Sequence, residues 1–124
     1  MANLGSLESA IMGVLWDAGE PLRVRELLAK LNEDRDLAYT TVQTVAERLV
    51  KKGLLARTPY RNAFRYSTVR SRDEHVAQLM LEALAASADR LPVLARFAHA
   101  VEEADALALL DELSRRTGQR RSTT

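Results

Sequence analysis

Basic side chains are concentrated in one stretch of the chain, between positions 48 and 72. No aspartate or glutamate interrupts this stretch, which contains Arg48, Lys51, Lys52, Arg57, Arg61, Arg65, Arg70 and Arg72. Guanidinium and ammonium groups at this density bind phosphate oxygens through charge-assisted hydrogen bonds. The stretch therefore predicts a polyanionic partner, with a solvated basic loop as the alternative interpretation.

Polar, uncharged side chains that suit base edges come just before this stretch. They share one face of a predicted helix and are Tyr39, Thr40, Gln43 and Thr44. Glutamine pairs well with adenine, and the threonine methyl group contacts thymine. Glu47 lies on the same face, where phosphate would repel it, so we expect it at the edge of the contact or paired with Lys51. The alternative is an ordinary solvated helix face.

The chain offers little for catalysis or metal binding. It has no cysteine, which excludes disulfides, thiolate metal sites and cysteine catalysis. His75 and His99 are isolated, so we expect them to face solvent or cap helices rather than hold a metal. Trp16, Tyr66 and Phe97 lie on apolar stripes or strands, which favours core packing over a ligand cage. Without a glycine-rich phosphate loop or a nucleophile elbow, the sequence predicts no enzyme, no cofactor and no metal site.

Charge is distributed unevenly along the 124 residues. Positions 1–70 carry eleven basic and eight acidic residues and positions 71–124 carry seven and nine, so the two parts are net +3 and −2. We therefore expect the polyanion to bind the first part only. Glu8 and Asp17 interrupt the apolar run near the N-terminus, and no stretch reaches membrane-spanning length. A cytoplasmic protein without a membrane partner is expected.

Three helices are predicted before the hairpin. The first begins at the N-cap residue Ser6 and stops at Gly19, the second covers 24–32, and the third covers 39–52. Gly53 suits the left-handed position that follows a helix. The apolar spacing predicts that one face of each helix is buried. The residues expected to face inward include Ile11, Leu15, Val24, Leu27, Val42, Val45, Ala46 and Leu49.

A β-hairpin is predicted after the third helix, with strands at 54–58 and 64–69. Asn62 is expected to take the left-handed conformation in the turn. Pro59 cannot donate to a strand ladder, so its strand should end there or lie at the sheet edge. Helix, helix, helix and hairpin is the order of a winged helix-turn-helix DNA-binding domain. We assign this domain to 1–70, with the wing at 55–69.

Further helices are predicted after the hairpin, which makes the fold class mainly α (α+β). Ser71 and Glu74 form a capping box at the start of the first of them, and Gly118 is expected to end the last. These helices are too short for an independent core, so a second copy should cover their apolar faces; folding back onto the winged domain is the alternative. The sequence thus predicts a helical dimerisation domain at 71–118 and a flexible tail at 119–124. The residues expected at the dimer interface are Val76, Leu79, Met80, Leu84, Leu94, Phe97, Leu107, Leu110 and Leu113.

One run of residues in the third helix is fairly specific: Thr-Thr-Val-x-Thr-Val-x-x-Arg-Leu-x-Lys-Lys-Gly at 40–53. With the segment around it, 36–55, it resembles the penicillinase repressor family (BlaI/MecI type). Three further features match, namely Leu7-Glu8 leading to Leu15-Trp16, Arg65-Tyr66 at the end of the wing, and the helix start Arg72-Asp73-Glu74. The resemblance covers about 4–113.

The resemblance implies a homodimeric transcriptional repressor that binds double-stranded DNA at pseudo-palindromic operators upstream of β-lactam-resistance and related genes. Carried over by position, it implies DNA reading by Tyr39, Thr40, Gln43 and Thr44 and a wing around Arg61. Together with the basic residues of the same surfaces, the expected DNA-binding set is Tyr39, Thr40, Gln43, Thr44, Arg48, Lys51, Arg57, Arg61 and Arg65.

The resemblance also implies how repression is relieved. In the best-known members a membrane-anchored metalloprotease sensor leads to a cut in the dimerisation domain, and the matching bond here joins Arg96 to Phe97. The residue before Phe97 is arginine, where those members carry asparagine. The copper-responsive relatives use a cysteine cluster, so that mode of induction is excluded. The rival hypotheses are a small-molecule-responsive winged-helix regulator and a winged-helix protein-interaction module without DNA binding.

Overall fold

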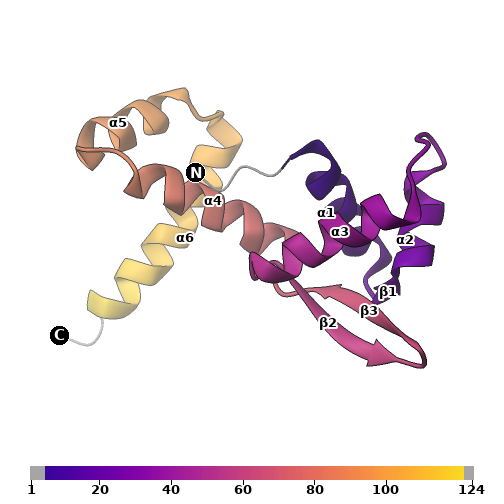
Figure 1. The fold of residues 1–124 in the computed structure, drawn as a ribbon. Helices are drawn as coiled ribbons and strands as arrows, with labels where there is room; N and C mark the ends of the chain where they lie inside the picture. The colour runs from indigo at the N-terminus through magenta and orange to yellow at the C-terminus, as the bar shows by residue number, and fades with distance from the viewer. Residues whose placement is uncertain (1–4, 122–124) are drawn as a thin grey trace. The chain divides into compact units, whose positions relative to one another are not determined.

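The computed structural model describes residues 5–121, with side chains described up to position 118. The chain forms two compact units, one ending at Glu82 and the other beginning at Ala83, so the division falls inside a helix. The elements appear in Figure 1, and their bounds are α1 Ser6–Ala18, β1 Leu22–Arg23, α2 Val24–Leu31, α3 Tyr39–Lys51, β2 Leu55–Tyr60, β3 Ala63–Thr68, α4 Arg72–Ala85, α5 Arg90–Ala100 and α6 Glu103–Arg121. This order confirms the predicted sequence of three helices, a hairpin and further helices.

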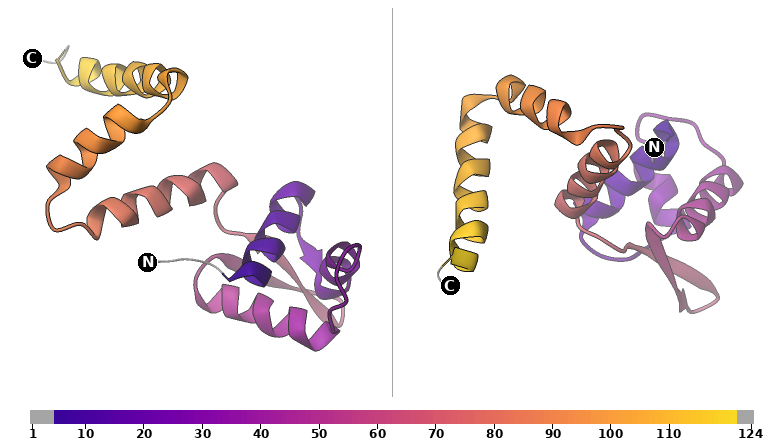
Figure 2. Two further views of the ribbon diagram at one scale, coloured as in Figure 1. Left: turned by 90° about the horizontal axis from the view of Figure 1, so that it is seen from above. Right: turned by 90° about the vertical axis from the view of Figure 1, so that its left-hand side faces the viewer.

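The first unit is built around one apolar core that three helices and the sheet share. In each helix the buried residues recur at spacings of three and four, because such residues lie on one helix face. The hairpin projects from the helical group in the views of Figures 1 and 2. The buried core residues are Ile11, Met12, Leu15, Leu22, Val24, Leu27, Leu31, Val42, Val45, Ala46, Leu49, Leu55 and Tyr66.

The sheet contains one strand that the sequence did not predict. The strand order is β1-β3-β2 and both pairings are antiparallel, with Leu22 of β1 opposite Tyr66 of β3. β1 has only two residues, which is too short to show an alternating pattern. Pro59 lies in the edge strand β2, so the prediction that its strand runs along an edge is confirmed.

Local geometry at three sites differs from the predictions. The left-handed residue of the hairpin turn is Arg61, with φ 56°, and not Asn62. The two-residue turn has its positive φ at the first central position, a backbone demand that overrides the preference of asparagine. The N-cap of α1 is Gly5 rather than Ser6, one residue earlier than expected. α6 continues through Gly118 to Arg121, because a helical glycine costs only about 1 kcal/mol and need not end a helix.

The helices after the hairpin expose much of their apolar surface. Leu110 is 61% exposed and Phe97 is 41% exposed within the single chain. The core packing predicted for Phe97 is therefore not met within one chain, and its place in a dimer interface stays a prediction. α6 belongs to the predicted dimerisation domain, and positions 122–124 of the predicted tail lie outside the described residues. The other exposed apolar side chains of α4, α5 and α6 are Val76, Met80, Leu81, Leu91, Val93, Leu94, Leu107, Leu109 and Leu113.

Candidate nucleic-acid interface

The outer face of α3 carries the predicted reading residues in exposed positions. Packing of the opposite face into the core fixes this orientation. Ala38, the N-cap of α3, offers no side-chain cap, and the first turn contains no acidic residue. Arg48 and Lys51 lie in the last turn, where their charge complements the helix dipole. The exposed residues are Tyr39, Thr40, Gln43, Thr44, Arg48 and Lys51.

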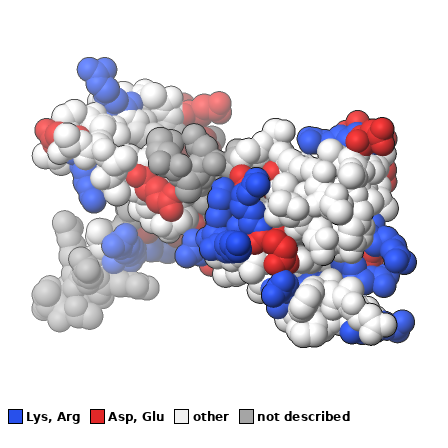
Figure 3. All heavy atoms as spheres, viewed as in Figure 1, with Lys and Arg blue, Asp and Glu red and all other residues white. Residues whose placement is uncertain are grey.

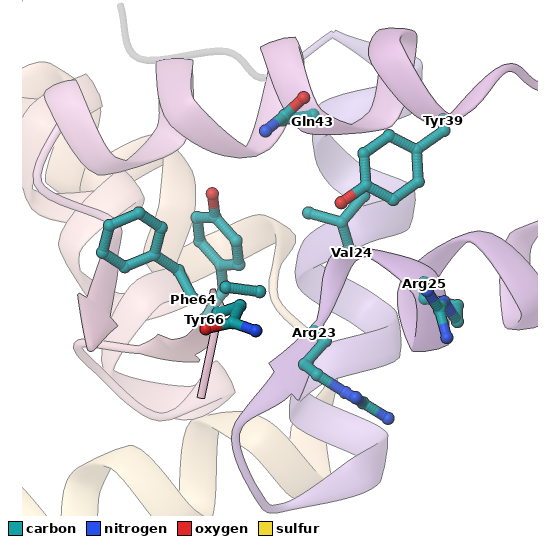
Figure 4. Close-up of a pocket in the computed structure, with 9 residues that line it drawn as sticks. Arg23, Val24, Arg25, Tyr39, Gln43, Phe64 and Tyr66 are labelled. Atoms are coloured by element: carbon teal, nitrogen blue, oxygen red, sulfur yellow. The ribbon is translucent and has the colours of Figure 1, made fainter. Parts of the chain in front are cut away.

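A hollow lies between α3 and the hairpin, with a volume of about 250 Å³. Figure 4 shows Tyr39 and Gln43 of α3 on one side of it and Phe64 and Tyr66 of the hairpin on the other. A second hollow continues from Gln43 along α3 toward its C-terminal end. Its lining is Gln43, Thr44, Glu47, Arg48, Lys51, Arg57, Phe64 and Tyr66. Helix and hairpin therefore form a continuous concave surface.

Glu47 occupies the middle of this surface and is bound to the hairpin. Its Oε1 accepts a hydrogen bond from Nη1 of Arg57 at 2.6 Å, and its Oε2 accepts one from the hydroxyl of Tyr66. The predicted pairing with Lys51 is wrong, because the register of β2 and β3 places Arg57 opposite Tyr66 on the side facing α3. Burial, and then the hydrogen bond to Glu47, raise the pKa of Tyr66 far above its usual range.

The basic residues of the hairpin are divided between its two faces. Arg57 lies on the α3 side, with its Cζ 4.3 Å from the centroid of the Phe64 ring. Arg65 neighbours Tyr66 in β3, so its side chain leaves from the opposite face. There it stacks on Tyr60, 4.1 Å from the ring centroid, and its buried Nε has no hydrogen-bond partner among the described residues.

Two further arginines lie near the ring of Tyr60. The Cζ of Arg61 lies 5.3 Å from the Tyr60 ring centroid and that of Arg23 lies 6.0 Å away. Arg23 comes from β1, opposite Arg65 in the sheet. The sequence did not point to Arg23 as part of a basic surface, because only the pairing of β1 with β3 brings it beside the hairpin.

Lys52 is directed to another part of the molecule. Its Nζ lies 2.8 Å from Oε2 of Glu8, a buried carboxylate at the start of α1. The hydrogen bond from Lys52, and then that from the backbone N–H of Gly5, lower the pKa of Glu8. Lys52 thus belongs to the link between α1 and α3, and not to the exposed face of α3.

The junction between the hairpin and α4 is tied to α1. The indole N–H of Trp16 donates to the carbonyl of Arg70 at 3.0 Å, and Arg72 pairs with Asp17 at 2.9 Å. His75 is only 8% exposed and its ring centroid lies 5.3 Å from that of Trp16. The prediction that His75 faces solvent or caps a helix is therefore wrong, since the first turns of α4 pack against α1. His99 is exposed, as expected.

Some basic residues of the stretch 48–72 pair with carboxylates from other parts of the sequence, although the stretch itself contains no acidic residue. Among the described residues, the members of the basic stretch that form ion pairs are Lys52, Arg57 and Arg72. Figure 3 shows the result: basic side chains lie where α3 ends and along the hairpin, with acidic side chains between them. The members of the stretch left to bind an external anion are Arg48 and Lys51 on α3, Arg61 in the hairpin turn, Arg65 on the outer face of the hairpin, and Arg70 after it.

Two further features of the part of the chain that the structure describes concern membrane spans and metal-binding groups. From residue 5 to residue 121, no helix is long and apolar enough to cross a membrane. The same residues contain no group of three or more histidine, aspartate or glutamate side chains that could hold a metal ion.

Comparison with known proteins gives matches over most of the chain. The family profile described as penicillinase repressor matches residues 4–115. The transcriptional regulator BlaI of Mycobacterium tuberculosis, strain H37Rv, is 46% identical over 112 residues, which are 86% of this chain and 81% of that protein. The BlaI of strain CDC 1551 matches equally well.

Two of the similar solved structures have low sequence identity to this chain. The complex structure of hsRosR-S4 superposes with a TM-score of 0.53 at 19% identity, over 87% of this chain and 94% of that chain. A MarR family protein from Bacillus stearothermophilus gives a TM-score of 0.49 at 19% identity, over 96% of this chain and 76% of that chain. At this level of identity, the likeness to hsRosR-S4 concerns the fold alone.

Proposed function

The chain belongs to the penicillinase repressor family of transcriptional regulators and has a winged helix-turn-helix fold, and from this we propose that it is a homodimeric repressor that occupies a dyad operator. Each copy places α3 in a major groove and its hairpin on the flanking backbone. Repression follows because the dimer occupies the promoter. The observation that carries this proposal is the exposed polar face of α3 beside a basic hairpin.

The proposed contacts divide into base reading and phosphate binding. Thr40, Gln43 and Thr44 are uncharged and exposed, so they suit base edges. Tyr39, at the start of α3, suits the sugar-phosphate backbone. The basic groups suited to phosphate are Arg48, Lys51, Arg61 and Arg65, whereas Arg57 is held by Glu47.

The dimer is proposed on the exposed apolar surface of α4, α5 and α6. A monomer that leaves so many leucines in water loses hydrophobic stabilisation that a second copy would supply. The proposed interface residues keep their places on these helices, and Leu79 and Leu84 are half-buried already. The proposed domain limits remain 1–70 for the winged domain and 71–118 for dimerisation.

Relief of repression is proposed to come from a protease that cuts between Arg96 and Phe97. Arg96 and Phe97 lie on α5, and both side chains are exposed in the single chain. Phe97 also belongs to the proposed dimer interface, so the interface has to open before a protease can reach this bond. Proteases bind extended backbone, however, so the two turns around this bond have to unwind first. The genes controlled are proposed to be of the β-lactam-resistance or a related type, as in the family.

Footprinting of purified protein on genomic fragments tests the proposal. We expect two protected half-sites related by a dyad and separated by about one helical turn or a multiple of it. We also expect affinity to fall steeply with salt concentration, because several phosphates are neutralised. A protein that protects no duplex even at low salt would contradict the proposal and favour a protein-interaction module. The genes beside the protected sites identify the regulated pathway.

A further inference from the structure

Glu47 is an unexpected residue on a surface proposed to bind a polyanion. It lies in the same hollow as Gln43, Thr44 and Arg48, where a free carboxylate would repel phosphate. In the structure both of its oxygens are occupied by groups of the hairpin, Arg57 on one and Tyr66 on the other. The carboxylate is therefore already satisfied within the chain.

Arg57 is equally committed to this contact. Among the described residues of the hairpin, it is the basic side chain on the face that looks toward α3, since Arg65 leaves from the other face and Arg61 lies in the turn. Its guanidinium is held by Glu47 on one side and by the Phe64 ring on the other. A phosphate approaching the groove has to compete with this carboxylate for the same donors.

We propose that Glu47 is a positioning residue that withholds Arg57 from phosphate. The inference rests on the DNA binding proposed above. In the resting protein Arg57 acts as the partner of Glu47 and not as a DNA contact, which lowers the affinity of the α3 face for DNA of any sequence. Tyr66 keeps the carboxylate in place, because its hydroxyl reaches Glu47 from a buried ring.

The pair is exposed enough for its charge to matter to a ligand. The side chains of Arg57 and Glu47 are 40% and 33% exposed, so water and a phosphate can both reach the guanidinium. An exposed ion pair of this kind contributes little to stability. Its main effect is therefore on the charge that the groove presents, and removing the carboxylate should release one phosphate-binding group.

Salt titrations of binding to a duplex of unrelated sequence test this inference, with fluorescence anisotropy as the readout. Glu47→Gln keeps the size of the side chain and removes its charge. We expect the slope of log affinity against log salt to steepen by about 0.9, and affinity to rise about eightfold near 0.1 M salt, as one added phosphate contact predicts. Glu20→Gln is the matched control, because it removes the same charge from the α1–α2 side and releases no arginine.

A double variant tests the inference without leaving any charge unpaired. Glu47→Gln combined with Arg57→Gln should bind with the slope of the unaltered protein, since Arg57 makes no phosphate contact to lose. A slope lower by about 0.9 in the double variant would overturn the inference, and so would equal slopes for Glu47→Gln and Glu20→Gln. If the unaltered protein binds no duplex, the proposed function itself fails and the inference falls with it. Thermal melts confirm that each variant is folded.

Discussion

At the scale of single residues, the proposed base reading and phosphate binding are divided between the exposed face of α3 and the hairpin. Gln43 and Thr44 are uncharged and lie beside the hollow that faces the hairpin. Arg61 lies at the hairpin turn in a left-handed conformation. Uncharged groups distinguish bases, whereas charged groups bind every phosphate alike. Replacing a residue of each kind should therefore have different consequences.

Gln43→Ala and Arg61→Ala are the two informative substitutions. We expect Gln43→Ala to reduce the preference for the operator over unrelated DNA by about 1–3 kcal/mol, with little change in salt dependence. Arg61→Ala should weaken binding to both duplexes alike and make the salt slope shallower by about one. Anisotropy titrations on both duplexes measure these effects. An unchanged operator preference in Gln43→Ala, together with its loss in Arg61→Ala, would reverse the assignment.

At the scale of elements, α3 is anchored at its C-terminal end as well as through its apolar face. The ion pair between Lys52 and Glu8 joins the end of α3 to the start of α1. Glu8 also caps α1, because it accepts a hydrogen bond from the backbone N–H of Gly5. These contacts favour the ionised carboxylate, so they lower the pKa of Glu8 below its usual value of 4.5. Folding and ionisation of Glu8 are therefore linked.

Glu8→Gln should lower stability at neutral pH by about 1 kcal/mol, a figure reduced for the exposure of Lys52. Because the pKa is lowered in the folded state, the contribution of Glu8 is present above about pH 4.5 and is lost as pH falls through the lower folded value. The difference between the unaltered protein and Glu8→Gln should therefore shrink in acid. Urea unfolding at several pH values measures it. A difference that grows in acid would contradict the assignment, and Glu20→Gln is the control for lost charge.

At the scale of the whole molecule, the two ends of the chain have different surfaces. The winged part buries its apolar residues in its own core, whereas α4, α5 and α6 leave theirs exposed. An unpartnered apolar surface favours self-association, and a dimer would present two copies of α3 to one duplex. A dimer that binds two half-sites at once has a much higher affinity than a single copy, although each copy makes the same contacts to DNA.

Leu110→Asp should disrupt the proposed dimer. A carboxylate in an apolar interface is costly, so we expect a monomer in sedimentation experiments at micromolar concentration. Operator affinity should fall by on the order of a hundredfold, because the second half-site no longer binds in the same complex. Ala108→Asp places the same charge on the opposite side of α6 and should leave the dimer intact. A dimer that survives Leu110→Asp would refute this interface.

Much of the fold could be predicted because it depends on neighbours in the sequence. The spacing of Val42, Val45, Ala46 and Leu49 predicted the buried face of α3, and all four are buried. Ser71 and Glu74 predicted a capping box, and both of its hydrogen bonds are present. Helical periodicity and capping act within one or two turns, so the sequence alone contains the information for them.

The candidate site could be predicted only in part. The exposed residues of α3 and the basic hairpin followed from local pattern, but the partners of the charged groups did not. The tertiary structure decided that Glu47 binds Arg57, that Lys52 turns to Glu8 and that His75 is buried against Trp16. Each of these contacts joins residues at least ten positions apart. A sequence without acids between Arg48 and Arg72 therefore determines where basic groups occur, and the packing of distant segments determines which of them remain available to bind DNA.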